Sequence, residues 1–259
     1  MMDIKQIFNS KYQLKNLKVD RTRFLDKLRE YTQNQGPWMI PGVDFTKTTR
    51  WGHNHDFGEG VCVPGTMEDR HYRIMNRFLQ EGLPSDLAGK QVLVIGCYTG
   101  GDALSLAALG AEVDAVEEVP LYAEISAWLA DSFGAKLKVH TGSIDREAIR
   151  SKYKAQSFDF IYNAGVIYHL RNIICGLENC HYFLKDNGIM FLETMVAEGQ
   201  LIDPIKEKLL IYRGPSVSGY NWYLPNVEAV LAICKDIGFT PRFFHAEPNS
   251  RASFICKKP

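Results

Sequence analysis

One short segment combines glycine spacing with a nearby carboxylate in a way that suits a nucleoside ligand. VLVIGCYTGG places Gly96, Gly100 and Gly101 directly after a run of apolar residues. Glycines at a strand-to-helix turn let the backbone turn tightly and approach a ligand, because no Cβ stands in the way. Glu117 ends the next apolar run, where a carboxylate can accept hydrogen bonds from both ribose hydroxyls. These residues predict a site for an adenosine-bearing ligand.

The middle of this turn argues against a dinucleotide. Tyr98 stands where Gly-x-Gly-x-x-Gly has its second glycine, so close approach of a pyrophosphate is hindered. A ligand with a sulfonium and an amino-acid tail needs no phosphate cradle. Val94 occupies the position where methyltransferases usually carry an acidic residue, so the amino group of such a ligand needs another acceptor. Backbone carbonyls at Gly96 or Asn163 are candidates, and so is the carboxylate of Asp102.

Three consecutive residues after the third predicted strand are expected to flank the adenine. Ser143, Ile144 and Asp145 follow the segment KLKVHTG. Ile144 would stack on the base, and Asp145 or a backbone amide would form a hydrogen bond with it.

Alternating apolar and helical stretches must position these residues. Strands are predicted at QVLVIG, EVDAVE, KLKVHTG, FDFIYNAG and GIMFLETMV, with helices at 102–109, 121–133, 145–153 and 171–183. Strands separated by helices imply right-handed βαβ units and a parallel, doubly wound sheet. A helix from Asn226 to Gly238 precedes FTPRFFHAE and RASFICKK, which predict an antiparallel hairpin. We expect a Rossmann-like α/β fold, mostly parallel with a C-terminal antiparallel hairpin, typical of class I methyltransferases rather than dehydrogenases.

The first 80 residues predict a small helical cap and substrate lid ahead of this domain, which would span residues 81–259. Apolar periodicity indicates helices at 21–31 and 67–80, and residues 36–65 are rich in Gly, Pro and aromatics, as lids and binding loops are. Residues 1–35 hold eight Lys/Arg against four Asp/Glu, although the whole chain is balanced at 30 against 30. This basic leader is either the solvated face of a packed helix or an arm for a partner or nucleic acid.

Cysteine usage and hydropathy bear on the compartment. The six cysteines form no CxxC pair, no apolar run reaches about 18 residues, and the N-terminus lacks the apolar core of a signal peptide. We therefore expect reduced thiols, no membrane contact and a cytoplasmic protein. His53, His55 and Cys62 could ligate a metal, but no second pair completes a four-ligand set, so no metal site is predicted.

Four short segments of the chain carry a resemblance to one known enzyme family. The family's Gly-Val-(Leu/Ile)-Tyr-His segment is matched by Gly165–His169, and its Leu-Glu-Thr strand end by Leu192–Thr194. Its Tyr-x-(Ile/Leu)-Pro-(Ser/Asn) segment is matched, one residue shorter, by Tyr223–Asn226, and its Gly-Pro-(aromatic)…Gly-Val segment ahead of the domain by Gly36–Val43. In their order and spacing over residues 36–259, these segments resemble the tRNA wobble-uridine carboxymethyltransferases that use carboxy-S-adenosylmethionine, and their small-molecule methyltransferase relatives.

The resemblance implies the cofactor and part of its site. In the family, a lysine just before Gly-Pro, the tyrosine of Tyr-His and an arginine in the last strand hold the cofactor's extra carboxylate. Tyr168 and Arg251 match, but Gln35 occupies the lysine position, which favours plain S-adenosylmethionine over carboxy-S-adenosylmethionine. The family's N-terminal domain would be reduced here to residues 1–35, and this reduction and the balanced charge favour a smaller acceptor than tRNA. The predicted cofactor-binding set is Gly96, Tyr98, Gly100, Glu117, Ser143, Ile144, Asp145, Asn163 and Arg251.

Methyl transfer from a sulfonium is an in-line displacement, for which a protein supplies alignment, desolvation and, where needed, a base. His169 is the candidate base, with a purely structural histidine as the alternative. Tyr168 would position the methyl group, the cofactor or the acceptor, because an unperturbed phenol with a pKa of about 10 stays protonated. Glu193, at the end of the fifth strand, would orient the acceptor or satisfy loop amides.

Together these features predict an S-adenosylmethionine-dependent methyltransferase acting on a small molecule. Carboxymethyl or methyl transfer to the wobble uridine of tRNA is the first alternative. A non-catalytic protein that binds an adenosine ligand is the second. The oligomeric state stays open, a homo-oligomer included.

Overall fold

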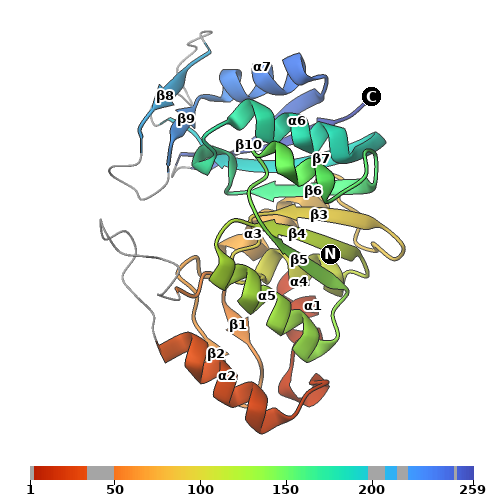
Figure 1. The fold of residues 1–259 in the computed structure, drawn as a ribbon, viewed down its shortest axis with the longest axis vertical. Coiled ribbons are helices and arrows are strands. Elements are labelled where there is room, and N and C mark those ends of the chain that lie inside the picture. The colour runs from red at the N-terminus through yellow and green to blue at the C-terminus, as the bar shows by residue number, and fades with distance from the viewer. Residues whose placement is uncertain (1–2, 34–49, 198–207, 215–220, 248–249) are drawn as a thin grey trace. The chain divides into compact units, whose positions relative to one another are not determined.

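The structure is a computed structural model that describes residues 3–33, 50–197, 208–214, 221–247 and 250–259. The chain divides into two compact units, residues 1–142 and 143–259 (Figure 1).

Three parallel strands form the sheet of the first unit. β3 (Gln91–Ile95), β4 (Glu112–Glu117) and β5 (Leu137–Thr141) lie in the order β3-β4-β5. The last four residues of β3 are all buried, the near-continuous apolar run expected of a strand covered on both faces. Helices α4 (Gly101–Ala108) and α5 (Pro120–Phe133) connect the strands, and α5 packs on β4 and β5 (Figure 1).

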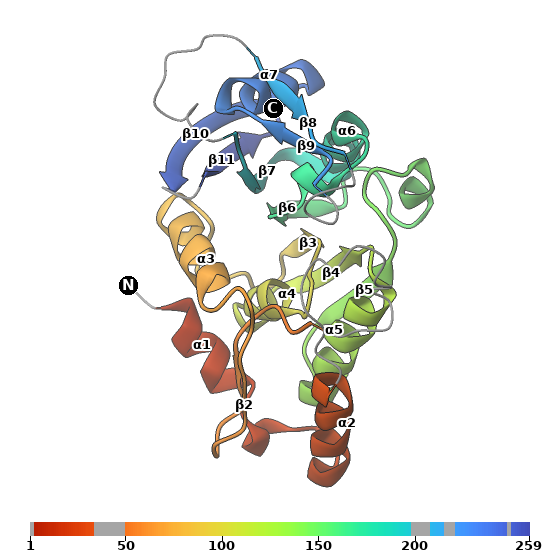
Figure 2. The same cartoon turned by 90° about the vertical axis from the view of Figure 1, so that its left-hand side faces the viewer.

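The N-terminal helices belong to this first unit. α1 (Ile4–Lys11) and α3 (Arg70–Gln80) lie beside each other and beside α4 (Figures 1 and 2). The predicted helix at 21–31 is present as α2 (Arg21–Gln33), whose buried residues are Phe24, Leu28 and Tyr31. The helix predicted from residue 67 begins only at Arg70, because Glu68 has a φ of +48°, outside the right-handed helical region.

Short elements complete the first unit. A 3₁₀ turn covers Leu14–Asn16, and β1 (His55–Asp56) pairs antiparallel with β2 (Cys62–Val63). The predicted lid or loop at residues 36–65 therefore contains a small hairpin in its described part.

The second unit holds the strands of the C-terminal half in the order β10-β11-β7-β6. β6 (Phe158–Ala164) and β7 (Leu184–Met195) are parallel, whereas β11 (Arg251–Lys257) pairs antiparallel with both β7 and β10 (Thr240–Glu247). The predicted C-terminal hairpin is thus confirmed. A further hairpin joins β8 (Leu210–Tyr212) to β9 (Tyr223–Pro225).

Capping residues explain where the helices of this unit begin and end. α7 (Val227–Ile237) follows Asn226, whose side chain accepts a hydrogen bond from the Ala229 amide, and ends at Gly238 with a φ of +110°, as predicted. α6 (Ile173–Phe183) begins two residues later than predicted because Asn172 caps it. The prediction of a helix at 145–153 is wrong, because only a 3₁₀ turn at Glu147–Ser151 forms there. Ile149 is the one buried residue of this turn. A second 3₁₀ turn covers Ile167–His169.

Within the described ranges, no helix combines the length and apolar character needed to cross a membrane. All six cysteines are free thiols, as expected.

Candidate functional site

The glycine turn of the first unit adopts the strained backbone that its sequence requires. Gly96 and Gly100 have φ values of +68° and +85°, in the left-handed region that glycine tolerates best. Tyr98 also lies there, at +49°, which costs about 1–2 kcal/mol for a residue with a Cβ. Its carbonyl accepts a hydrogen bond from the Ser126 hydroxyl at 2.9 Å, and its ring meets Tyr122 edge-on at 4.5 Å between centroids. The surrounding structure therefore holds Tyr98 in this conformation.

The Glu117 carboxylate lies at the end of β4, directly against this turn. One oxygen accepts the Tyr98 amide hydrogen at 2.8 Å, and the other accepts that of Val119 at 3.0 Å. Burial raises the pKa of Glu117 to about 7, although hydrogen bonds from the backbone amides of Val119, Tyr98 and Glu118 lower it. A carboxylate has about four lone-pair sites, so that of Glu117 can accept a further donor such as a ribose hydroxyl.

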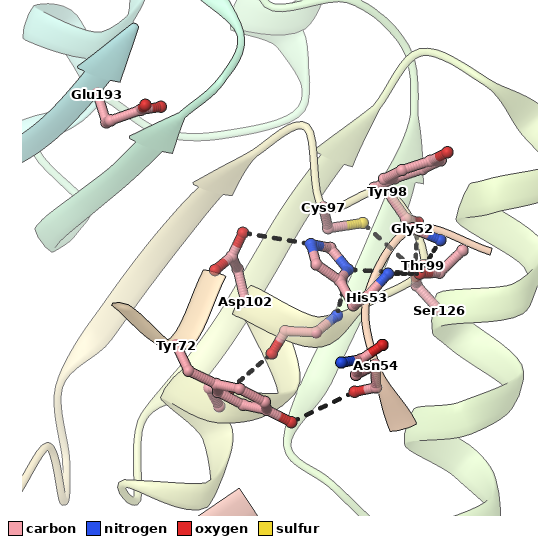
Figure 3. Close-up of polar contacts among 12 residues, drawn as sticks. Gly52, His53, Asn54, Tyr72, Cys97, Tyr98, Thr99, Asp102, Ser126 and Glu193 are labelled. Atoms are coloured by element: carbon pink, nitrogen blue, oxygen red, sulfur yellow. Dashed lines mark hydrogen bonds and ion pairs between the residues drawn. The ribbon is translucent and has the colours of Figure 1, made fainter. Parts of the chain in front are cut away.

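The N-terminus of α4 is occupied by an imidazole from the loop that precedes β1. His53 Nδ1 accepts the Gly101 amide hydrogen at 3.1 Å, and Nε2 lies 3.6 Å from the Asp102 carboxylate (Figure 3). Helix N-termini bind phosphates because their amide donors and dipole favour negative charge. Here the first amide donor of the helix is already taken by His53. The Gly101 amide is therefore not free to bind a phosphate, and the adenosine ligand at this turn stays a prediction.

Close packing joins the loop around His53 to the glycine turn. A Cβ on Gly52 would lie 2.0 Å from the Tyr98 ring, and one on Gly65 would lie 2.3 Å from the His53 carbonyl carbon. Sequence reasoning did not connect His53 with the turn. The signal that could have revealed it was the pair of glycines, Gly52 and Gly65, on either side of the His-Asn-His segment.

The residues predicted to flank the adenine are held together in the second unit. The Ser143 hydroxyl donates to the Asp145 carboxylate at 2.8 Å, and the same carboxylate accepts the Asn172 amide hydrogen at 3.1 Å. Ile144 is buried, with its carbonyl accepting from the Asn179 side chain at 2.7 Å. The Asn163 side chain is also buried and faces the Cys180 thiol. Their contacts with adenine stay predictions.

Residues from three of the segments singled out in the sequence meet at another point of the second unit. Arg251 and Glu193 form a bidentate ion pair, with Arg251 Nη2 2.9 Å from Glu193 Oε2 and a second bond between Nε and Oε1. The guanidinium carbon lies 5.5 Å from the centre of the Tyr168 ring. A Cβ on Gly165, whose φ is +77°, would come within 3.3 Å of Arg251 Nη2. The glycine of Gly-Val-Ile-Tyr-His therefore leaves space for the arginine.

This cluster is buried, and the charges of Arg251 and Glu193 balance each other within it. The side chains of Glu193 and Arg251 are 1% and 6% exposed. Burial lowers the pKa of Arg251, but Tyr168 and Glu193 together raise it above its ordinary value, so the guanidinium stays charged. Because Glu193 already neutralises Arg251, a further carboxylate here would compete with Glu193 for the same donors.

His169 ends the 3₁₀ turn that carries Tyr168. Its ring centroid lies 4.0 Å from that of Tyr168, and it is half-buried. The Tyr168 carbonyl accepts the Trp222 amide hydrogen at 2.9 Å, which ties this turn to the segment leading into β9. The arrangement brings together a phenol, an imidazole and a buried carboxylate from the predicted catalytic set. Gln35, Gly36–Val43 and much of 198–220 lie outside the described residues.

Comparison with known proteins identifies the family. Residues 67–241 match a methyltransferase domain family. The chain belongs to this family. It is 28% identical over 159 residues to a tRNA U34 carboxymethyltransferase of Hydrogenovibrio crunogenus, covering 60% of this chain and 46% of that protein. It is 30% identical over 181 residues to a ubiquinone biosynthesis O-methyltransferase of Methylocella silvestris, covering 63% of this chain and 67% of that protein. The chain thus spans about half the length of the first of these two relatives.

Solved structures confirm the predicted Rossmann-like methyltransferase fold. The N-terminal domain of EvdMO1, solved with SAH bound, has a TM-score of 0.62 at 13% identity and covers 93% of this chain and 98% of its own. The YcgJ protein of Bacillus subtilis has a TM-score of 0.57 at 12% identity, over 73% of this chain and 99% of its own. At these identities the likeness concerns the fold.

Proposed function

We propose that the protein is an S-adenosylmethionine-dependent methyltransferase acting on a small-molecule acceptor. The observation that carries this proposal is the turn from Gly96 to Gly101. Glu117 is poised there to accept ribose hydroxyls, and the α4 N-terminus is filled by His53 instead of being open to a phosphate. Family membership and the match to a structure solved with SAH support the same cofactor.

The chain's own residues fit this cofactor in defined roles. Gly96, Tyr98 and Gly100 would contact it through their backbone, and Glu117 would hold the ribose. Ser143, Ile144, Asp145, Asn163 and Arg251 complete the proposed binding set. When bound, S-adenosylmethionine supplies a methyl group on a sulfonium. The charge balance between Arg251 and Glu193 favours the plain cofactor over its carboxylated form.

Catalysis would depend on alignment and on one proton transfer. His169 would accept the proton from the acceptor's nucleophilic atom, a role that histidine side chains commonly take in general base catalysis. Tyr168, buried beside the Arg251 guanidinium, would fix the position of the reacting groups. Glu193 would orient the acceptor while it stays paired with Arg251.

The basic leader supports a small acceptor over tRNA. Lys5 pairs with Asp69 at 2.6 Å, Arg21 with Glu59 at 2.7 Å, and Lys27 with Glu30 at 3.1 Å. These charges are thus partly balanced on the unit itself, which lowers the field available to a phosphate backbone. The tRNA-modifying relatives make wobble uridine the alternative acceptor.

We further propose a cap and lid at residues 1–80 with the methyltransferase domain at 81–259. The free thiols support a reducing, cytoplasmic location.

The experiment is a transfer assay with S-adenosylmethionine labelled in its methyl group. The protein is incubated with separate small-molecule and tRNA fractions of a cell extract, and a Glu117→Ala variant serves as control. Label in the small-molecule fraction that disappears with the variant supports the proposal. Label in tRNA alone would replace it with the tRNA alternative. No transfer to either fraction, together with tight cofactor binding, would indicate the non-catalytic alternative.

A further inference from the structure

We propose that His53 is a positioning residue for the cofactor, because its unprotonated Nδ1 holds the Gly101 amide and the Thr99 hydroxyl and so fixes the glycine turn in its binding conformation. This inference rests on the proposed function, since it concerns the turn that receives the adenosine ligand. His53 lies more than 40 residues before that turn, in the segment from Arg50 to Val63.

The hydrogen bonds determine which tautomer His53 adopts. The Gly101 amide can only donate, so the Nδ1 that it contacts at 3.1 Å must carry a lone pair. The proton of the neutral ring is therefore on Nε2, which faces the Asp102 carboxylate at 3.6 Å. Burial lowers the pKa of His53 well below its usual value, helped by His71 and His55, which keeps the ring neutral.

Thr99 links the loop to the turn through further hydrogen bonds. Its Oγ1 accepts the amide hydrogens of Gly52 and His53, each at 3.2 Å, and lies 3.3 Å from His53 Nδ1 (Figure 3). Because Nδ1 of His53 is unprotonated and the two amides donate to Oγ1, the Thr99 hydroxyl can donate its own hydrogen only to that nitrogen among these groups. The imidazole thus shares its lone pair between a backbone donor and a side-chain donor of the turn.

The hydrogen bonds among His53, Thr99 and Gly101 fix the backbone of the part of the turn that a ligand must approach. Thr99 and Gly101 flank Gly100, the N-cap residue of α4, which has a φ of +85°. Tyr98, next to Thr99, donates its amide hydrogen to Glu117. Loss of the acceptor at Nδ1 would leave a buried amide unpaired, and the turn would relax to pair it elsewhere. Ligand binding would then have to restore the original turn at the expense of affinity.

Two substitutions that are isosteric with each other separate the effect of losing the acceptor from the effect of losing the ring. In His53→Asn, Oδ1 stands as many bonds from Cα as Nδ1 does, so it can accept the Gly101 hydrogen. His53→Leu has the same shape without an acceptor. Calorimetry with S-adenosylhomocysteine measures the affinity of the native protein and both variants, and thermal unfolding compares their stability. We expect His53→Asn to bind within about threefold of native, and His53→Leu to bind at least about tenfold more weakly.

Each outcome decides a different question. Equal affinities of the Asn and Leu variants, both strong or both weak, would overturn the positioning role. If the native protein itself binds no S-adenosylhomocysteine, the proposed function fails instead. A third measurement needs no variant: ¹⁵N NMR of the native protein should report Nδ1 of His53 as unprotonated and Nε2 as protonated. The reverse tautomer would also overturn the proposal.

Discussion

Replacing Glu117 with glutamine should change how the stability of the unliganded protein depends on pH. The Glu117 carboxyl has a folded-state pKa of about 7, raised by burial above the ordinary 4.5. Between these two values the folded protein binds more protons than the unfolded chain. Its contribution to stability is therefore fully present below pH 4.5 and is lost as the pH rises through 7.

The magnitude follows from these two pKa values. A shift of one unit corresponds to about 1.4 kcal/mol, so the full effect is roughly 3 kcal/mol. Most of it falls within an accessible range: between pH 5.5 and 8, native Glu117 should lose about 2 kcal/mol of stabilisation. The glutamine side chain of the Glu117→Gln variant does not titrate. The difference in unfolding free energy between the two proteins should therefore shift by about 2 kcal/mol in the variant's favour over this range.

Urea unfolding of both unliganded proteins at pH 5.5 and 8, followed by tryptophan fluorescence, measures this difference. Because the other titrating groups are common to both proteins, their contributions cancel in the comparison. A difference that stays constant between the two pH values would refute the burial argument for Glu117. It would also remove the reason to expect the carboxylate to be buried against the turn.

The remaining predictions concern stability at three other places. Burial lowers the pKa of His71 to about 3, so the stability that the neutral imidazole contributes is lost as the pH falls below 6.5. In urea titrations, His71→Leu should therefore lose about 2 kcal/mol less unfolding free energy than the native protein between pH 7 and 5. Equal losses of unfolding free energy in both proteins would contradict this. Glu193→Leu or Arg251→Met alone should lower the unfolding free energy by about 3–5 kcal/mol, because each leaves a buried charge unpaired. The double variant should lose much less unfolding free energy than either single variant. Additive losses in the double-mutant cycle would show that the pair is not coupled. Gly65→Ala should lower the melting temperature because its Cβ would meet the His53 backbone, whereas Gly142→Ala, with nothing within 4 Å, should not; similar melting temperatures would contradict the packing of the His53 loop.

Local patterns were sufficient to predict most of the fold. Apolar runs located the five parallel-type strands, and Asn226 and Gly238 marked the two ends of α7 through chemistry that operates within a few residues. The failures were also local: Glu68 adopts a positive φ that delays α3, and only a 3₁₀ turn at Glu147–Ser151 forms where a helix was predicted at 145–153. Neither could be read from apolar spacing alone.

The candidate site was harder to predict because its contacts join distant segments. The sequence suggested that Glu193 ends a strand and that Arg251 begins the last one, but not that they pair. Their pairing depends on the register of β11 with β7, in which Ser253 lies opposite Glu193 and Arg251 opposite Met195. Similarly, the turn from Gly96 to Gly101 was recognisable, whereas the His53 imidazole that completes it comes from a loop whose path no local rule specifies.

Native mass spectrometry of the purified protein, with S-adenosylmethionine or NAD added at equal concentration, tests the central claim most directly. The account predicts a one-to-one complex with S-adenosylmethionine that is lost in Glu117→Ala, and no complex with NAD. A stable NAD complex, or S-adenosylmethionine binding unaffected by the loss of Glu117, would contradict it.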